Sequence, residues 1–179
     1  MRKIICALSV LGTLIFALAV SAAAPVNFAG TWTLDKSKSQ GLSPRAQGAD
    51  SVSWTITQTD KAITVEEKVT GGTMAGGPGG PGGGGGRGGF GGGPRTYNLD
   101  GSETTADMGR GKATRKASWS GDGKTLELST KNVFQGQDGE VTMTSTEKLQ
   151  LSGDGKTLTV TRHSEGPRGP QDSTYVFTK

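Results

Sequence analysis

Four charged residues stand where the surrounding sequence otherwise places apolar side chains. They are Glu67, Arg115, Glu147 and Arg162, and each belongs to a run in which every second residue is apolar. Burying an unpaired charge is strongly unfavourable. These side chains must therefore pair with one another, reach solvent at the ends of strands, or face a ligand.

Arginine suits a negatively charged ligand, because its planar guanidinium donates two parallel hydrogen bonds to a carboxylate. We hypothesise that Arg115 and Arg162 hold an anionic head group, with Glu67 and Glu147 in the same interior site. The apolar part of the ligand would be lined by five aromatic residues: Trp32, Trp54, Tyr97, Trp119 and Phe177. The competing interpretation is two internal Arg–Glu pairs, or side chains that extend to solvent at the strand ends.

Other chemistry has little support in the sequence. His163 is the only histidine, and no Gly-x-Ser-x-Gly nucleophile motif accompanies it. The sequence contains no metal-ligand spacing and no phosphate-binding Gly-Lys-Ser/Thr loop. We therefore expect no catalytic residues, no metal and no cofactor, and a function other than an enzyme's.

The elements that must position these residues are strands. Apolar residues alternate with Thr, Ser, Lys, Gln and Glu, a pattern typical of strands with one buried face. We predict strands near 30–35, 51–58, 62–70, 95–99, 102–106, 113–119, 125–131, 140–151, 156–163 and 172–178.

A repeated heptapeptide marks two of the connections. Ser-Gly-Asp-Gly-Lys-Thr-Leu occurs at residues 120–126 and again at 152–158, each time between two alternating runs. Asp and Gly tolerate the backbone of tight hairpins, so both copies are predicted to be β-hairpin turns. A calcium loop is the alternative, but each copy has one carboxylate and a calcium ion needs six to eight oxygens.

The chain divides into a targeting segment and one domain. Residues 1–24 have the basic start, apolar run and small-residue end of a secretory signal peptide, which predicts a periplasmic or secreted protein. Residues 25–179 form the domain and contain no cysteine, because Cys6 lies in the signal. Within the domain, residues 71–93 are predicted to be a flexible Gly-rich loop.

Charge and composition restrict the partners only weakly. The chain has 20 Lys and Arg against 16 Asp and Glu. Loss of Arg2 and Lys3 with the signal would leave an excess of only two positive charges. No Lys/Arg run marks a nucleic-acid or membrane surface, so we expect a small apolar or anionic ligand, no nucleic acid, and a mature chain that is not embedded in a membrane.

We predict an all-β fold, an antiparallel up-and-down meander of 8–10 strands closed into a barrel, because closure removes exposed edges. An outer-membrane barrel is an alternative, but short strands and an aromatic content of 6% do not favour it. A surface or interaction protein that uses the Gly-rich loop is another.

The first strand carries a family resemblance. Gly30 and Trp32 match the Gly-x-Trp signature that opens the first strand of lipocalins and their calycin relatives. The chain as a whole is also similar to small exported bacterial proteins of lipocalin-like type. The resemblance implies a calycin-type barrel and leaves the function open. It also implies that a late arginine, here Arg162, packs across Trp32. The Thr-Asp-Tyr segment, the disulfides and the helix after the barrel that typical lipocalins possess have no counterpart in this sequence.

Overall fold

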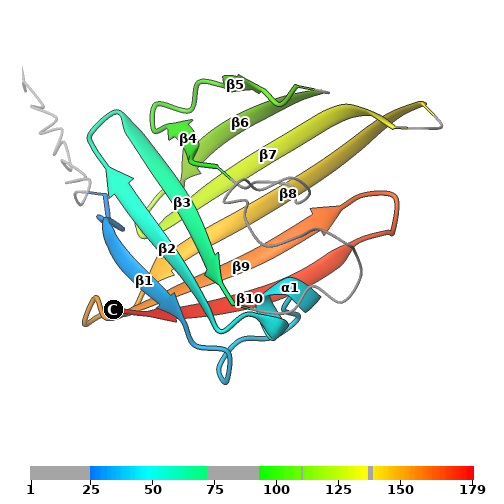
Figure 1. The fold of residues 1–179 in the computed structure, drawn as a ribbon. Coiled ribbons are helices and arrows are strands. Elements are labelled where there is room, and N and C mark those ends of the chain that lie inside the picture. Colours follow the sequence, from blue (N-terminus) through cyan, green and yellow to red (C-terminus); the bar gives the residue numbers. More distant parts are fainter. Residues whose placement is uncertain (1–24, 72–92, 110, 137–138) are drawn as a thin grey trace, which may run out of the picture.

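The fold is that of a single antiparallel sheet that curls into a nearly closed barrel (Figure 1). It is described from a computed structural model, which covers residues 25–71, 93–109, 111–136 and 139–179. The predicted signal peptide and most of the predicted Gly-rich loop lie outside these residues. The strands are β1 (Gly30–Leu34), β2 (Ser51–Gln58), β3 (Ala62–Thr70), β4 (Arg95–Asn98), β5 (Thr104–Asp107), β6 (Gly111–Trp119), β7 (Thr125–Gly136), β8 (Gly139–Leu151), β9 (Thr157–Glu165) and β10 (Gln171–Thr178).

The strand order is that of an up-and-down meander. It runs β4-β3-β2-β1-β10-β9-β8-β7-β6-β5, so only the β1–β10 pair joins strands that are not consecutive. A seam remains between β4 and β5, where Thr104 Oγ1 donates to the carbonyl of Thr96 at 3.0 Å. The predicted all-β barrel of 8–10 antiparallel strands is thereby confirmed. Each predicted strand overlaps an observed one, but β7 continues five residues beyond the predicted end at residue 131.

The alternation of apolar and polar residues marks the buried and exposed faces of the strands, as predicted. Apolar residues of the strands face inward and are buried, whereas Thr, Ser, Lys and Glu of the opposite parity face outward. Thr favours extended backbone because it is β-branched, so the outer faces stay polar without weakening the strands.

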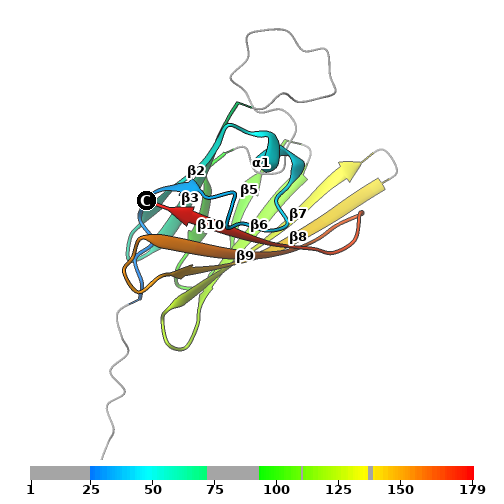
Figure 2. The same ribbon diagram turned by 90° about the horizontal axis from the view of Figure 1, so that it is seen from below.

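One element has no counterpart in the sequence pattern. The helix α1 (Pro44–Gly48) lies between β1 and β2, with Ser43 as its N-cap and Pro44 in its first turn (Figure 2). The cap hydroxyl accepts a hydrogen bond from Ala46 N at 3.2 Å, and Lys36 Nζ donates to the carbonyls of Gln47 and Ala49 at the other end. Five residues are too few for a helical hydrophobic period, so α1 depends on these caps. No helix in the described part of the chain is long and apolar enough to cross a membrane.

The two ends of the barrel differ. We call the end that carries the β2–β3, β4–β5, β6–β7 and β8–β9 turns the closed end, and the opposite one the open end. The N-terminal residues cross the closed end, where Val26 N donates to Gly123 O and Gln58 Nε2 donates to Val26 O. Phe28 and Trp32 are fully buried there, and Trp32 Nε1 donates to Phe28 O at 2.9 Å.

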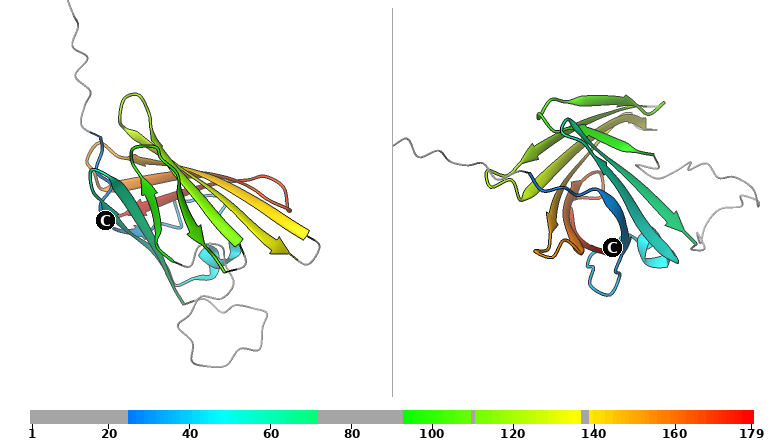
Figure 3. Two further views of the ribbon diagram at one scale, coloured as in Figure 1. Left: turned by 90° about the horizontal axis from the view of Figure 1, so that it is seen from above. Right: turned by 90° about the vertical axis from the view of Figure 1, so that its left-hand side faces the viewer.

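Among the described residues, the open end carries α1 and a protruding hairpin. The β7–β8 hairpin extends beyond β9, because the pairing between β8 and β9 begins only at Thr144 and Glu165. Figures 1 and 3 show the protruding hairpin, and α1 lies at the same end of the barrel.

Both copies of the repeated heptapeptide are hairpin turns at the closed end, as predicted. In the second copy Ser152 Oγ donates to Asp154 Oδ1 at 2.6 Å, and Lys156 N donates to the same carboxylate oxygen at 3.1 Å. Ser120, Asp122 and Lys124 repeat these contacts in the first copy. The carboxylate thus closes the turn itself. No group of three or more His, Cys, Asp or Glu within the described ranges is arranged to hold a metal ion.

These turns depend on one glycine each. Gly155 has a φ of +68°, which costs an L-residue about 1–2 kcal/mol. Gly155→Ala is therefore expected to lower the free energy of unfolding by about that amount, measured by urea denaturation. Gly153→Ala is the matched control, because Gly153 lacks a positive φ and a Cβ there meets open space. Equal effects of the two substitutions would contradict this account of the turn.

Candidate functional site

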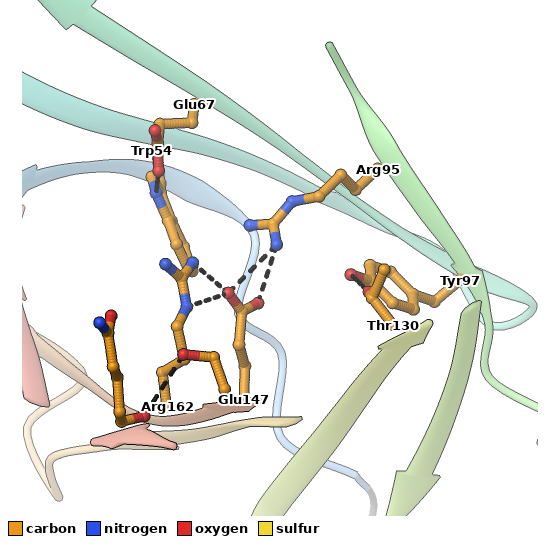
Figure 4. A network of polar contacts seen from close by, with 9 residues as sticks. Trp54, Glu67, Arg95, Tyr97, Thr130, Glu147 and Arg162 are labelled. Atoms are coloured by element: carbon orange, nitrogen blue, oxygen red, sulfur yellow. Dashed lines mark hydrogen bonds and ion pairs between the residues drawn. The ribbon is translucent and has the colours of Figure 1, made fainter. Parts of the chain in front are cut away.

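Two arginines share one buried carboxylate in the barrel interior. Arg95 Nη1 donates to both oxygens of Glu147 at 3.1 Å. Arg162 donates to Glu147 Oε1 through Nε at 2.8 Å and also through Nη2. Glu147 is 1% exposed, so this carboxylate interacts with guanidinium groups rather than with water. Figure 4 shows the contacts converging on it.

The strand register brings these residues together. Glu147 of β8 and Arg162 of β9 are direct cross-strand partners on the interior face. Arg95 opens β4, which lies on the far side of the seam and reaches Glu147 across the barrel. The triad therefore joins β4 to the β8–β9 wall.

The charges in the triad stabilise one another. Burial works to raise the pKa of Glu147, but its ion pairs with Arg162 and Arg95 outweigh this and hold that pKa at about 2. Burial works to lower the pKa of Arg162, and the attraction of Glu147 raises it beyond its usual value. The triad is thus fully ionised at neutral pH and carries a net positive charge.

Aromatic rings surround the two arginines. The Arg95 guanidinium lies over the ring of Trp54 at 5.3 Å, and the Arg162 guanidinium lies over Tyr175 at 5.1 Å. Trp54 Nε1 donates to Glu67 Oε2 at 3.0 Å, and the Trp54 ring packs on Phe177 at 4.8 Å. Glu67 thus has an indole partner, and the cations are held by π faces as well as by Glu147.

A second polar group lies beside the triad, on β4, β6 and β7. The hydroxyls of Tyr97 and Thr130 are 2.9 Å apart and both residues are buried. Arg115 is the cross-strand partner of Thr130. Its Nε is buried and has no hydrogen-bond partner among the described residues.

A pocket of ≈ 490 Å³ opens at the rim of the barrel. It is formed by the β7–β8 hairpin and by the turn from β9 to β10. Phe134, Val141 and Met143 provide its apolar wall, and Ser164, Gln171 and Arg168 are among its polar residues. Phe134 lies four residues beyond Thr130 on β7, which is roughly 13 Å along the same interior face.

The interior therefore changes character along its length. Toward the closed end, the inward positions of β7 are Leu126 and Leu128, both fully buried in the core. Farther along β7 they are Thr130 and Asn132, and Phe134 reaches the rim. The closed half of the barrel is thus packed, whereas the open half is polar inside and leads to the pocket.

The candidate residues found from the sequence separate into three places. The first set lies in or beside the triad: Glu67, Glu147, Arg162, Trp54 and Phe177. Arg115 and Tyr97 form the neighbouring polar group with Thr130. Trp32 and Trp119 lie at the closed end, where Trp119 stacks on Phe28 at 6.0 Å, so their side chains are remote from the pocket. The sequence hypothesis of two Arg–Glu pairs differs from the single carboxylate with two arginines that is observed.

Arg95 is the charged residue that sequence reasoning missed, along with the uncharged residues Thr130 and Tyr175 and the apolar pocket wall. It shares parity with Tyr97 and Leu99, which marks it as inward-facing. The signal was obscured because Arg95 directly follows the Gly-rich segment and a proline, where a strand start is hard to place.

The expected contact between Arg162 and Trp32 is wrong. Arg162 pairs with Ser173 of β10, whereas the β1–β10 register places Lys179 beside Trp32. Ser173 of β10 and Lys179, which directly follows β10, are six residues apart. Arg162 and Trp32 therefore lie roughly 20 Å from each other along the strand direction. Lys179 Nζ lies over the Trp32 ring at 4.7 Å and occupies the place expected for the arginine.

His163 lies on the outer face of β9. Its ring nitrogens contact Asp172 at 2.7 Å and Glu165 at 3.4 Å, and the hydrogen bond with Asp172 raises its pKa. Both partners are exposed carboxylates, and Glu165 also borders the rim pocket, whereas His163 itself does not line it.

Comparison with known proteins gives a distant structural likeness and no match in sequence. No family model and no curated protein matches the sequence. One similar solved structure is zebrafish ileal bile acid-binding protein in complex with cholic acid. It is 14% identical, the alignment covers 85% of this chain and 98% of that one, and the TM-score is 0.45. A likeness this distant carries no argument about function.

Proposed function

We propose that this protein binds a small amphipathic molecule with an anionic group in the open half of its barrel. The observation that carries the proposal is the pocket of ≈ 490 Å³ with an apolar wall at the rim, from which the interior strand faces lead past Asn132 and Ser145 to the arginine cluster. A pocket with mostly apolar walls and a few polar groups at one end is the usual form of a small-molecule site.

The charge balance supports a negatively charged group on the ligand. Among the described residues, three arginines face the interior of the open half, Arg95, Arg115 and Arg162, and two carboxylates, Glu67 and Glu147, accompany them. The rim pocket adds one charge of each sign, Arg168 and Glu165. In a region shielded from water, the uncompensated positive charge favours a bound anion.

The alternatives have less support. A barrel that spans an outer membrane needs an apolar band on its outside, whereas the outward strand faces here carry Thr, Ser, Lys and Glu. An interaction through the Gly-rich loop depends on residues outside the described ranges. Export through the predicted signal peptide remains part of the proposal, with the barrel acting in the periplasm or outside the cell.

A binding measurement tests the proposal. Dansyl-undecanoic acid is expected to bind the wild-type protein, and Met143→Glu is expected to weaken binding about tenfold or more, because it places a like charge on the pocket wall. Thr142→Glu is the matched control, since the adjacent side chain points outward. Fluorescence titration measures both.

Native mass spectrometry of protein purified from its own host provides the second measurement. A mass lacking about the first 24 residues together with a co-purified small molecule is the expected result.

In the fluorescence titration, absence of probe binding to the wild-type protein, or equal binding by Met143→Glu, would reject the interior site.

A further inference from the structure

We propose that Arg115, together with the Tyr97–Thr130 hydroxyl pair, is the subsite that binds the carboxylate of the ligand, and that the triad of Arg95, Glu147 and Arg162 is its structural support. This inference rests on the proposed function and adds the chemical class of the head group and its place.

Arg115 is the one interior arginine without a carboxylate partner among the described residues. Arg95 and Arg162 both bind Glu147, and Glu67 accepts the Trp54 indole. The buried Nε of Arg115 has no acceptor. A buried donor without an acceptor is unfavourable, so an acceptor supplied by a ligand would be bound strongly at this position.

The hydroxyl pair has a spare donor as well. Tyr97 and Thr130 each carry one O–H, and the hydrogen bond between them uses only one of the two. The second hydrogen has no acceptor among the described residues. Thr130 is 8% exposed and Tyr97 is fully buried, so water has little access to this pair.

The three residues lie close enough to act on one group. Arg115 and Thr130 are cross-strand partners on β6 and β7, and Tyr97 reaches Thr130 from β4. Burial raises the pKa of Tyr97, and the positive charges of Arg95 and Arg115 act against that rise, which is consistent with their proximity. Figure 4 shows the Tyr97–Thr130 pair apart from the contacts around Glu147.

The set offers hydrogen-bond donors and a positive charge but no negative charge, which favours an oxyanion. A carboxylate fits best, because it accepts from a guanidinium and a hydroxyl at the same time. The rim pocket lies roughly 13 Å farther along β7. The ligand class is therefore a carboxylic acid with an apolar tail that extends toward Phe134 and Met143.

The test compares an acid with a neutral analogue. Dissociation constants are measured by isothermal titration calorimetry for dodecanoic acid and for dodecanol, with wild-type protein, Arg115→Met and Lys116→Met. Lys116 is the adjacent residue on β6 and points outward. Arg115→Met is expected to weaken binding of the acid about 10- to 100-fold, with unchanged binding of the alcohol, and Lys116→Met is expected to change neither. Tyr97→Phe should weaken binding of the acid by a smaller factor.

A stability measurement separates a binding role from a structural one. Since Arg115 has no carboxylate partner among the described residues and its buried Nε has no acceptor there, Arg115→Met is expected to leave the melting temperature unchanged or to raise it. Equal affinity of wild type and Arg115→Met for the acid would overturn the subsite while the proposed function stands. A wild-type protein that binds neither compound would overturn both.

Discussion

Replacing Glu147 by alanine is expected to lower the free energy of unfolding by about 3–5 kcal/mol, the usual cost of removing one partner from a buried ion pair. The substitution leaves two guanidinium groups, Arg95 and Arg162, near each other without their shared carboxylate. The repulsion between these two cations, their lost hydrogen bonds and the cavity left by the removed side chain all destabilise the folded protein. Urea denaturation followed by tryptophan fluorescence measures the change.

Two controls define the origin of this loss. Glu127→Ala removes the exposed pair with Lys148, whose charged atoms are 3.5 Å apart, and is expected to cost less than about 1 kcal/mol. The triple variant Arg95→Met, Glu147→Leu, Arg162→Met replaces the whole triad with apolar groups and is expected to recover most of the lost stability. If Glu147→Ala cost no more than Glu127→Ala, the triad would not be an energetic unit.

The pH dependence of the free energy of unfolding measures the same interaction independently. The pKa of Glu147 in the folded protein is about 2, below its ordinary value of 4.5, because the pairs with Arg162 and Arg95 outweigh the effect of burial. A depressed carboxyl pKa contributes stability that is fully present above the unfolded pKa and is lost as the pH falls toward the folded one. The wild type should therefore lose this contribution between about pH 4.5 and pH 2, and Glu147→Gln should lack that component.

The register within the hairpins could be predicted from the sequence, because the repeated turns fix it. In an antiparallel hairpin the residue numbers of facing partners have a constant sum. The turn at 152–156 therefore places Arg162 opposite Glu147, and the turn at 120–124 places Arg115 opposite Thr130. Inward parity then assigns all four to the interior. The strands and these local pairs thus follow from alternation and turn chemistry.

Contacts across the barrel could not be predicted in this way. Arg95 reaches Glu147 only because the sheet curls until β4 meets the far wall, and its place depends on the total twist and closure of ten strands. The same closure places Lys179 rather than Arg162 over Trp32, since the β1–β10 pairing joins the two ends of the chain. Local sequence carries no signal for such distant pairs.

The difference between the two ends of the barrel has a physical basis. The closed half is filled by Leu126, Leu128 and the aromatic residues that the N-terminal segment covers. Burial of these apolar side chains contributes to the free energy of unfolding, as in any packed core. The open half contains charges and hydroxyls whose burial reduces stability unless they pair or bind a ligand. Substitutions in the closed half should therefore change mainly the free energy of unfolding, and substitutions in the open half mainly the affinity for the ligand.

Trp32→Ala is expected to lower the free energy of unfolding by about 3–5 kcal/mol, the range for a large aromatic residue removed from a core. Trp32 is fully buried, and its indole satisfies the buried carbonyl of Phe28. Trp119→Ala should cost less, because Trp119 is only partly buried at the same end. Urea denaturation measures both variants.

The same Trp32→Ala protein tests whether the two halves are independent. Under conditions in which it is folded, its dissociation constant for dodecanoic acid should equal that of the wild type, because the substitution lies at the end of the barrel opposite the rim pocket. A loss of affinity in folded Trp32→Ala would show that packing at the closed end determines the geometry around Arg115. The closed half would then belong to the binding site as well as to the core.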